Sequence, residues 1–137
     1  MDANVIVSGI LSRTGAPYEL LNAWRERRFL LLSSPAIIEE VRAVLHYPRI
    51  RKKYPLGDEE IEQTITLLEH DALLVAGESN VDGSVSDDPK DEMFLACALD
   101  GQADLIVSGD HHLLGLGIYR DIPIMTARWF LEQLSQE

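Results

Sequence analysis

Apolar residues recur along the chain with the spacings of amphipathic helices and of short buried strands. Spacings of three and four residues predict helices after Pro17 and over residues 34–46, 57–72, 88–100, 111–114 and 126–134. Short continuous apolar runs predict strands at residues 29–32, 73–76, 105–108 and 122–125. Polar residues 77–87 read as a loop, and residues 49–54 as a short basic helical turn. Strands that alternate with helices predict one α/β domain over residues 1–137, with a mostly parallel sheet.

Capping residues mark where three of these helices begin. Ser34 precedes Pro35, and Thr126 precedes the last apolar repeat. The run Asp88-Pro89-Lys90-Asp91 has the order of an N-cap followed by the first three helical positions. We therefore expect Ser34, Asp88 and Thr126 to accept hydrogen bonds from backbone amides of the first helical turn.

The helix over 34–46 carries two adjacent acids that point in different directions. At 100° per residue, the mean direction of its apolar face lies about 100° from Glu40 and about 160° from Glu39. Glu40 is therefore expected at the rim of the buried face, and Glu39 in water. This difference makes Glu40 the better candidate for a functional role.

Two further acids stand at the ends of predicted elements. Asp91 shares a helix face with Phe94, Leu95 and Ala98, because positions three, four and seven apart superimpose. Asp110 closes the strand over 105–108, at the edge where parallel sheets bind ligands. Carboxylates that converge from separate elements predict a cation site.

Composition and charge constrain the class of protein and the partners that it can bind. The apolar fraction of 46% predicts a folded chain. The single cysteine, Cys97, lies in a predicted apolar helix, as expected of a protein in the reducing cytoplasm. We expect neither a membrane span nor a signal peptide, because no apolar run is long enough and the first residues lack the pattern of a signal peptide. The net charge of −11 disfavours nucleic acid, yet eight of the twelve Lys and Arg lie between residues 25 and 53. These basic residues form either a local basic patch beside an acidic site or a solvated helical surface.

Four short motifs occur in the order of a known family. They are D-x-N-V at Asp2, S-P-x-I-x-E-E-V at Ser34, D-P-K-D-E-x-F-L-A-x-A at Asp88 and V-S-G-D-x-x-L-L at Val107. Together they resemble the PIN domain, particularly the branch of toxins from bacterial type II toxin–antitoxin pairs. The resemblance covers nearly the whole chain, although each motif alone is short and unspecific.

The resemblance implies a three-layer α/β/α sandwich and a metal-dependent endoribonuclease that uses Mg²⁺ or Mn²⁺. It places the acidic site on Asp2, Glu40, Asp91 and Asp110. Asn4, Ser108 and Asp88 would be supporting residues. It also implies an RNA substrate, an antitoxin partner and a homodimer.

The chemistry of phosphodiester hydrolysis is consistent with these acids. Negative charge builds on the phosphate oxygens, and divalent cations offset that charge and lower the pKa of water. Mg²⁺ and Mn²⁺ prefer oxygen ligands, so a few carboxylates are sufficient. Without a cation the carboxylates repel one another, so we expect metal to stabilise the fold.

The chain departs from the family's pattern at its amino end. In the family a hydrophobic strand precedes the D-x-N motif, whereas here only Met1 stands before Asp2. We expect residues 5–11 to form the helix that follows the motif, and the start of the chain to lack that strand.

Simpler roles and other functions stay open. Asp91, Asp88 and Asp110 would each stabilise a helix start without any ligand, and Glu40 would be a solvated rim residue. Asp100, Asp104, His111 and His112 read as surface or turn residues. The alternative functions are an RNA-processing nuclease outside a toxin–antitoxin pair, a non-catalytic binding module of the same fold, and an aspartyl-phosphate protein, which needs a suitably placed lysine.

Overall fold

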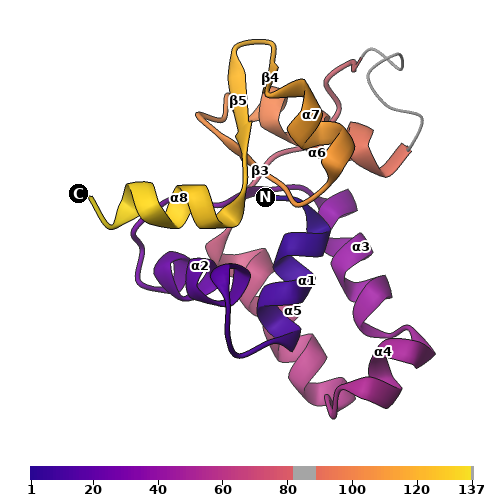
Figure 1. Cartoon of the computed structure of the whole chain (residues 1–137). Coiled ribbons are helices and arrows are strands. Elements are labelled where there is room, and N and C mark those ends of the chain that lie inside the picture. Colours follow the sequence, from indigo (N-terminus) through magenta and orange to yellow (C-terminus); the bar gives the residue numbers. More distant parts are fainter. Residues whose placement is uncertain (82–88, 137) are drawn as a thin grey trace.

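The computed structural model describes residues 1–81 and 89–136, and these residues form helices and short strands (Figure 1). The helices are α1 (Ala3–Leu11), α2 (Ala16–Arg25), α3 (Pro35–Leu45), α4 (Pro48–Lys53), α5 (Asp58–Asp71), α6 (Pro89–Asp100), α7 (His111–Leu116) and α8 (Ala127–Leu134). The strands are β1 (Leu32–Ser33), β2 (Leu73–Leu74), β3 (Ile106–Val107), β4 (Ile118–Tyr119) and β5 (Ile122–Met125). The predicted α/β class is confirmed, as is the helix expected at residues 5–11.

The strands pair within two separate sheets. In the first sheet β1 runs parallel to β2, with Leu32 opposite Leu73. In the second, of order β3-β5-β4, β3 is parallel to β5 and β4 is antiparallel to it. Residues 29–32 were expected to form a buried strand. This prediction is only partly correct, because β1 begins at Leu32 and the Leu30 side chain is 83% exposed.

Two of the three predicted caps lie within the described residues, and both are confirmed. The Ser34 hydroxyl accepts a hydrogen bond from the Ile37 amide at 3.3 Å. The Thr126 hydroxyl accepts one from the Trp129 amide at 3.1 Å. Asp88 lies outside the described residues.

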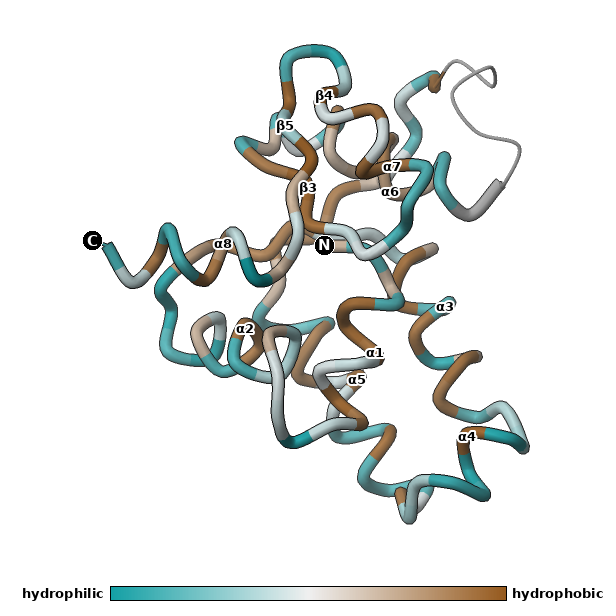
Figure 2. The backbone as a smooth tube through the Cα atoms, viewed as in Figure 1, coloured by the Kyte–Doolittle hydropathy of each residue, from teal (hydrophilic) through white to brown (hydrophobic). Residues whose placement is uncertain are grey.

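The helices bury their apolar stripes against one another and against the sheets. Apolar and polar stretches alternate along α3 and α5, as expected of helices that cover a core with one face (Figure 2). One apolar stripe, from Ile61 in α5 through Ile65 and Leu68 to Ala72 just after the helix, is buried throughout. α3 contacts α1, α4, α5 and α6, and α6 also contacts β1. α3 therefore links several helices, and α6 links α3 to a sheet. No helix among the described residues is long and apolar enough to cross a membrane.

Candidate functional site

Asp2 lies buried where the chain enters α1. Its backbone is extended, and its Oδ1 accepts a hydrogen bond from the Val5 amide at 2.9 Å, so it caps the helix. Its own amide donates to the Val107 carbonyl at 3.1 Å, which ties it to the end of β3. The Asp2 side chain is only 2% exposed. The carboxylate is thus held at the junction of a helix and a sheet.

Ser108 connects Asp2 to Asp110. It follows β3 directly and is fully buried, and its hydroxyl donates a hydrogen bond to Oδ2 of Asp2. The same hydroxyl accepts a hydrogen bond from the Asp110 amide at 3.0 Å. Asp110 in turn caps α7, because its Oδ1 accepts from the amides of His112 at 2.7 Å and Leu113 at 3.4 Å. Two predicted site acids from opposite ends of the chain are therefore joined through the predicted supporting serine.

Glu40 and Asp91 lie on two helices that contact each other, α3 and α6. Asp91 is in the first turn of α6 and is 4% exposed. Glu40 is half-buried, whereas Glu39 is exposed and pairs with Arg42 at 2.9 Å. The predicted difference between the two adjacent glutamates is confirmed.

The four acids supply the oxygen ligands that Mg²⁺ and Mn²⁺ prefer. All four are described, but within residues 1–81 and 89–136 no three His, Cys, Asp or Glu side chains are placed to hold one metal ion together. Asn4 is exposed on the first turn of α1, and Asp88 lies outside the described residues. The joint action of the four acids, and the supporting roles of Asn4 and Asp88, stay predictions.

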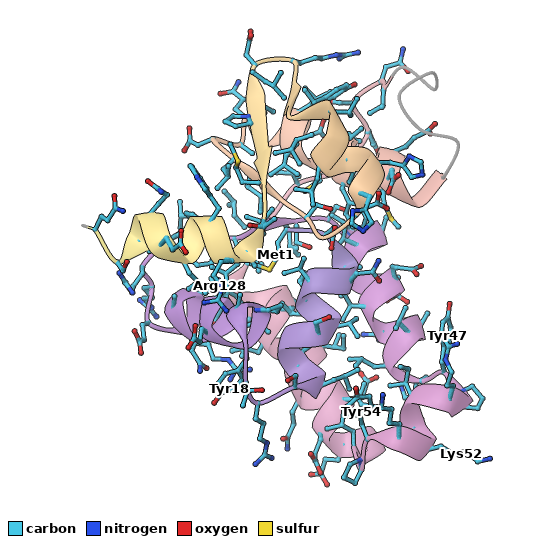
Figure 3. The ribbon with its side chains drawn as sticks, viewed as in Figure 1. Met1, Tyr18, Tyr47, Lys52, Tyr54 and Arg128 are labelled. Carbon is cyan, nitrogen blue, oxygen red and sulfur yellow. The ribbon has the colours of Figure 1, made fainter. Side chains whose placement is uncertain are left out.

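Two of the eight clustered basic residues form ion pairs with acids. Arg42 pairs with Glu39, Glu62 at 3.6 Å and Glu69 at 3.2 Å, and Arg51 pairs with Asp58 at 2.6 Å. Lys52 projects from the far end of α4 (Figure 3). Acids therefore offset part of the positive charge of this segment.

Two other titratable groups have shifted pKa values. Burial raises the pKa of the Cys97 thiol, which is a core residue as predicted. Asp100 accepts hydrogen bonds from the Ser79 hydroxyl and from the Glu78 amide, and these bonds lower its pKa. Sequence analysis missed this link between α6 and the segment after β2, because the partners are more than twenty positions apart and no local pattern joins them.

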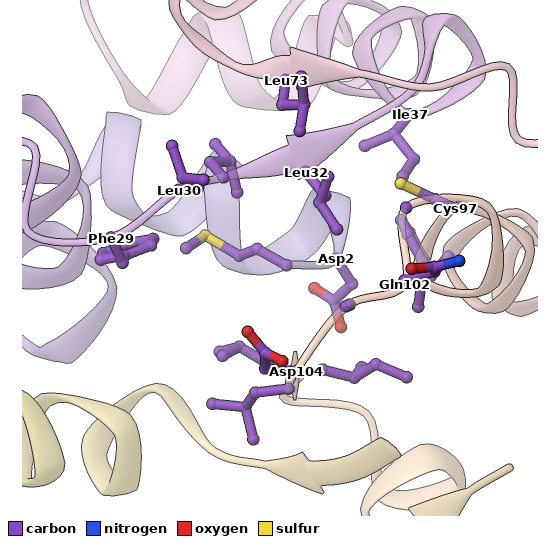
Figure 4. A pocket seen from close by; sticks show the side chains of 18 of the residues that line it. Asp2, Phe29, Leu30, Leu32, Ile37, Leu73, Cys97, Gln102 and Asp104 are labelled. Carbon is purple, nitrogen blue, oxygen red and sulfur yellow. The ribbon is translucent and has the colours of Figure 1, made fainter. Parts of the chain in front are cut away.

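A groove opens beside Asp2, between β1 and β3 (Figure 4). Its volume is about 430 Å³. Residues 30–32 form one wall and residues 105–107 the other, and most lining side chains are apolar. We call this feature the inter-sheet groove. Met1 lies in it, and burial lowers the pKa of the Met1 amino group.

Replacing Ser108 tests whether its two hydrogen bonds hold this part of the molecule together. We expect Ser108→Ala to lower the free energy of unfolding by about 1.5–3 kcal/mol, because a bond to a buried carboxylate is lost. Urea denaturation measures the change. Ser135→Ala is the matched control, since its exposed hydroxyl bonds only the Glu132 carbonyl and its loss should cost less than about 0.5 kcal/mol. Equal losses in the two variants would contradict the structural role of Ser108.

Comparison with known proteins agrees with the fold and the motif order. The family model described as PIN domain matches residues 1–112. The chain is also 26% identical over 116 residues to an uncharacterized protein of Methanocaldococcus jannaschii, an alignment that covers 85% of this chain and 72% of that relative. No solved structure matches the chain. Since the family model spans most of its length, the chain belongs to the PIN domain family.

Proposed function

We propose that this protein is a metal-dependent endoribonuclease that hydrolyses RNA with Asp2, Glu40, Asp91 and Asp110. PIN domains are generally nucleases, and the family model covers residues 1–112. The observation that carries the proposal is the buried Asp2 carboxylate, which Ser108 joins to the backbone of Asp110. A buried carboxylate is costly unless it is satisfied, and this one is held by two hydrogen bonds and is linked through Ser108 to a second acidic residue. We take this arrangement to favour a functional site.

Each acidic side chain would have a role set by the element that carries it. The amide of Val5 and the hydroxyl of Ser108 fix both oxygens of Asp2, so this carboxylate cannot rotate freely. Asp91 would approach from α6 and Glu40 from the rim of α3. When bound, Mg²⁺ or Mn²⁺ would lower the pKa of the attacking water and offset charge on the phosphate. The expected products carry a 5′-phosphate and a 3′-hydroxyl.

Incubation of purified protein with single-stranded RNA tests the proposal. We expect cleavage with Mn²⁺ or Mg²⁺ and none with a chelator, because the carboxylates alone would repel the phosphate. End-group analysis should find 5′-phosphates. Cleavage that persists without divalent metal, or that leaves 2′,3′-cyclic phosphates, would contradict the proposal, since the second product requires attack by the ribose hydroxyl.

A non-catalytic binding module is the second candidate, because the net charge of −11 repels RNA at long range. Thermal unfolding with and without Mn²⁺ separates the two. A nuclease with a cation site should gain about 2.7 kcal/mol of stability when Mn²⁺ is at about 100 times its dissociation constant. A module without a cation site should gain nothing.

We also propose that the nuclease is a toxin neutralised by an antitoxin protein and that it forms a homodimer. The support for both is the order of the four motifs. The acidic surface would suit a basic antitoxin segment. Growth arrest on expression, reversed by a neighbouring gene product, would distinguish a toxin from an RNA-processing nuclease with the same acids.

A further inference from the structure

A second pocket lies apart from the four acids, where α2 and α5 end. Its volume is about 380 Å³, within the range of about 300–1,000 Å³ that is typical of small-molecule sites. One wall comes from the end of α2 and the segment that follows it, and the other comes from His70 and Asp71 at the end of α5. None of the four proposed site acids lines it. We call this feature the α2–α5 pocket.

The lining of this pocket is basic, although the whole chain carries a net charge of −11. Arg25, Arg27 and His70 line it, and Asp71 is the one acid among its lining residues in the described part of the chain. Glu26 lies between the two arginines in the sequence but does not line the pocket. No ion pair within residues 1–81 and 89–136 involves either arginine. Arg25 and His70 lie in the last turns of α2 and α5, where positive charge also stabilises the helix dipole.

Helix stability does not explain Arg27, because its backbone position favours glycine. The Arg28 amide donates to the Ala23 carbonyl at 3.0 Å, and the Arg27 amide donates to the Trp24 carbonyl at 2.8 Å, so α2 ends in a Schellman motif. Arg27 is the left-handed residue of this motif, with φ 62°. A residue with a Cβ is less stable there than glycine. A side chain that persists in an unfavourable backbone conformation favours a functional role.

An apolar wall stands beside these basic groups. Trp24, Phe29 and Leu30 line the α2–α5 pocket. Phe29 is half-buried and packs edge-on against Phe130, with the ring centroids 5.0 Å apart, whereas Leu30 is 83% exposed. Arginine binds phosphate through paired hydrogen bonds, and aromatic side chains stack on the bases of single strands. The pocket therefore combines the two kinds of side chain that recognise a nucleotide.

We propose that the α2–α5 pocket binds a nucleotide, with its phosphate at Arg25 and Arg27 and its base against Phe29. A nucleotide of an RNA strand and a free nucleoside phosphate share this chemistry. The strand is favoured because RNA is the substrate in the proposed function, and this choice alone rests on that function. The pocket would hold the strand outside the four acids and offset part of the long-range repulsion between the chain and RNA. An acidic peptide would use the arginines but not the aromatic ring.

Binding of a short labelled single-stranded RNA, measured by fluorescence anisotropy in a chelator, tests the proposal. Arg27→Asn removes the charge and suits a left-handed backbone, so its melting temperature should not fall. We expect its dissociation constant to rise about fivefold or more. The slope of the logarithm of affinity against the logarithm of salt concentration should fall by about 0.7, the value for one phosphate contact of a single strand. Arg13→Asn is the matched control, since Arg13 is exposed and does not line the pocket, and its dissociation constant should change less than about twofold.

Two further measurements identify the base and the source of the nucleotide. Phe29→Leu keeps an apolar side chain but removes the ring, so it should raise the dissociation constant about fivefold and leave the salt slope unchanged. Millimolar adenosine monophosphate is the competitor. If it displaces the RNA from the parent chain and does so less well from Arg27→Asn, the nucleotide site is supported and a free nucleotide also occupies it. If it fails to displace RNA whose binding depends on Arg27 and Phe29, the site is supported and takes a strand.

Three outcomes would overturn the proposal. Equal RNA affinities of the parent chain and Arg27→Asn would show that the pocket holds no phosphate. Binding of neither RNA nor the mononucleotide would exclude a nucleotide site. A glutamate-rich peptide that displaces the RNA, and that binds Arg27→Asn weakly but Phe29→Leu as well as the parent, would assign the pocket to an acidic peptide. No measurement here requires cleavage. A chain that binds RNA through Arg27 and cleaves none would contradict the proposed function alone, and cleavage with unchanged affinity in Arg27→Asn would contradict this inference alone.

Discussion

Replacing Asp91 with asparagine should lower the rate of RNA cleavage by at least about 100-fold. The substitution keeps the size of a side chain that is 4% exposed, but it removes the charge that would hold a divalent cation. Single-turnover cleavage of a labelled RNA in Mn²⁺ measures the effect, and the thermal unfolding of the variant shows that it is folded. The Mn²⁺-induced stabilisation should disappear with the activity.

Glu92→Gln is the matched control for Asp91→Asn. Glu92 lies in the same first turn of α6, so its neutralisation removes a similar interaction with the helix dipole, worth about 0.3–1 kcal/mol. If both variants lose RNA cleavage equally, the loss is caused by a weakened first turn of α6 and not by a missing metal ligand. If Asp91→Asn cleaves RNA at the parent rate, the proposed site is wrong.

Replacing Glu40 with glutamine should lower cleavage by about 10–100-fold. Its side chain is half-buried on α3, a helix that contacts both α1 and α6, the elements that carry Asn4 and Asp91. Initial cleavage rates over a range of Mn²⁺ concentrations measure the change. A higher Mn²⁺ requirement would indicate a ligand role.

Glu39, the residue next to Glu40, supplies the control for Glu40→Gln. Glu39→Gln removes an exposed ion pair with Arg42, which contributes less than about 1 kcal/mol. Cleavage by this variant should match the parent rate. If Glu39→Gln and Glu40→Gln lose RNA cleavage equally, then cleavage depends on the negative charge of α3 and not on the direction of the Glu40 side chain.

Helices were predicted well because their signals are local. The Ser34 cap, the Pro35 start and the α5 stripe each lie within a few residues of the structure that they determine. Strand ends depend on partners far away in the chain, so residues 29–32 were assigned to a strand that in fact begins at Leu32. Within residues 1–81 and 89–136, β1 pairs with a single strand, β2. An apolar run alone therefore does not specify where β1 begins.

The β4–β5 hairpin was missed for a different reason. Its turn consists of Arg120 and Asp121, both with positive φ, at 45° and 71°. Such two-residue turns are normally signalled by Asn-Gly or a similar pair. Arg120 and Asp121 do not form such a pair, so the sequence predicted the strand at residues 122–125 but not the strand β4 before it.

The candidate site was found in part. Register within α3 distinguished Glu40 from Glu39, because helix geometry is a property of neighbouring residues. The contact of Ser108 with Asp2 spans 106 positions, and only the resemblance to a family pointed to it. A joint site of the four carboxylates would depend on the relative placement of α1, α3, α6 and β3, which no local pattern encodes.

The capping roles of Asp2 and Asp110 affect how loss-of-function variants are interpreted. In each residue Oδ1 serves as the amide acceptor that starts a helix. At Asp2 the other oxygen also accepts a hydrogen bond, from the Ser108 hydroxyl, so a cation there would compete with bonds to both oxygens. Ligand binding and helix initiation therefore draw on the same carboxylate. An alanine at either position would unwind a turn of α1 or α7 as well as remove a ligand. Asparagine, which retains a carbonyl oxygen for the cap, is therefore the informative replacement there.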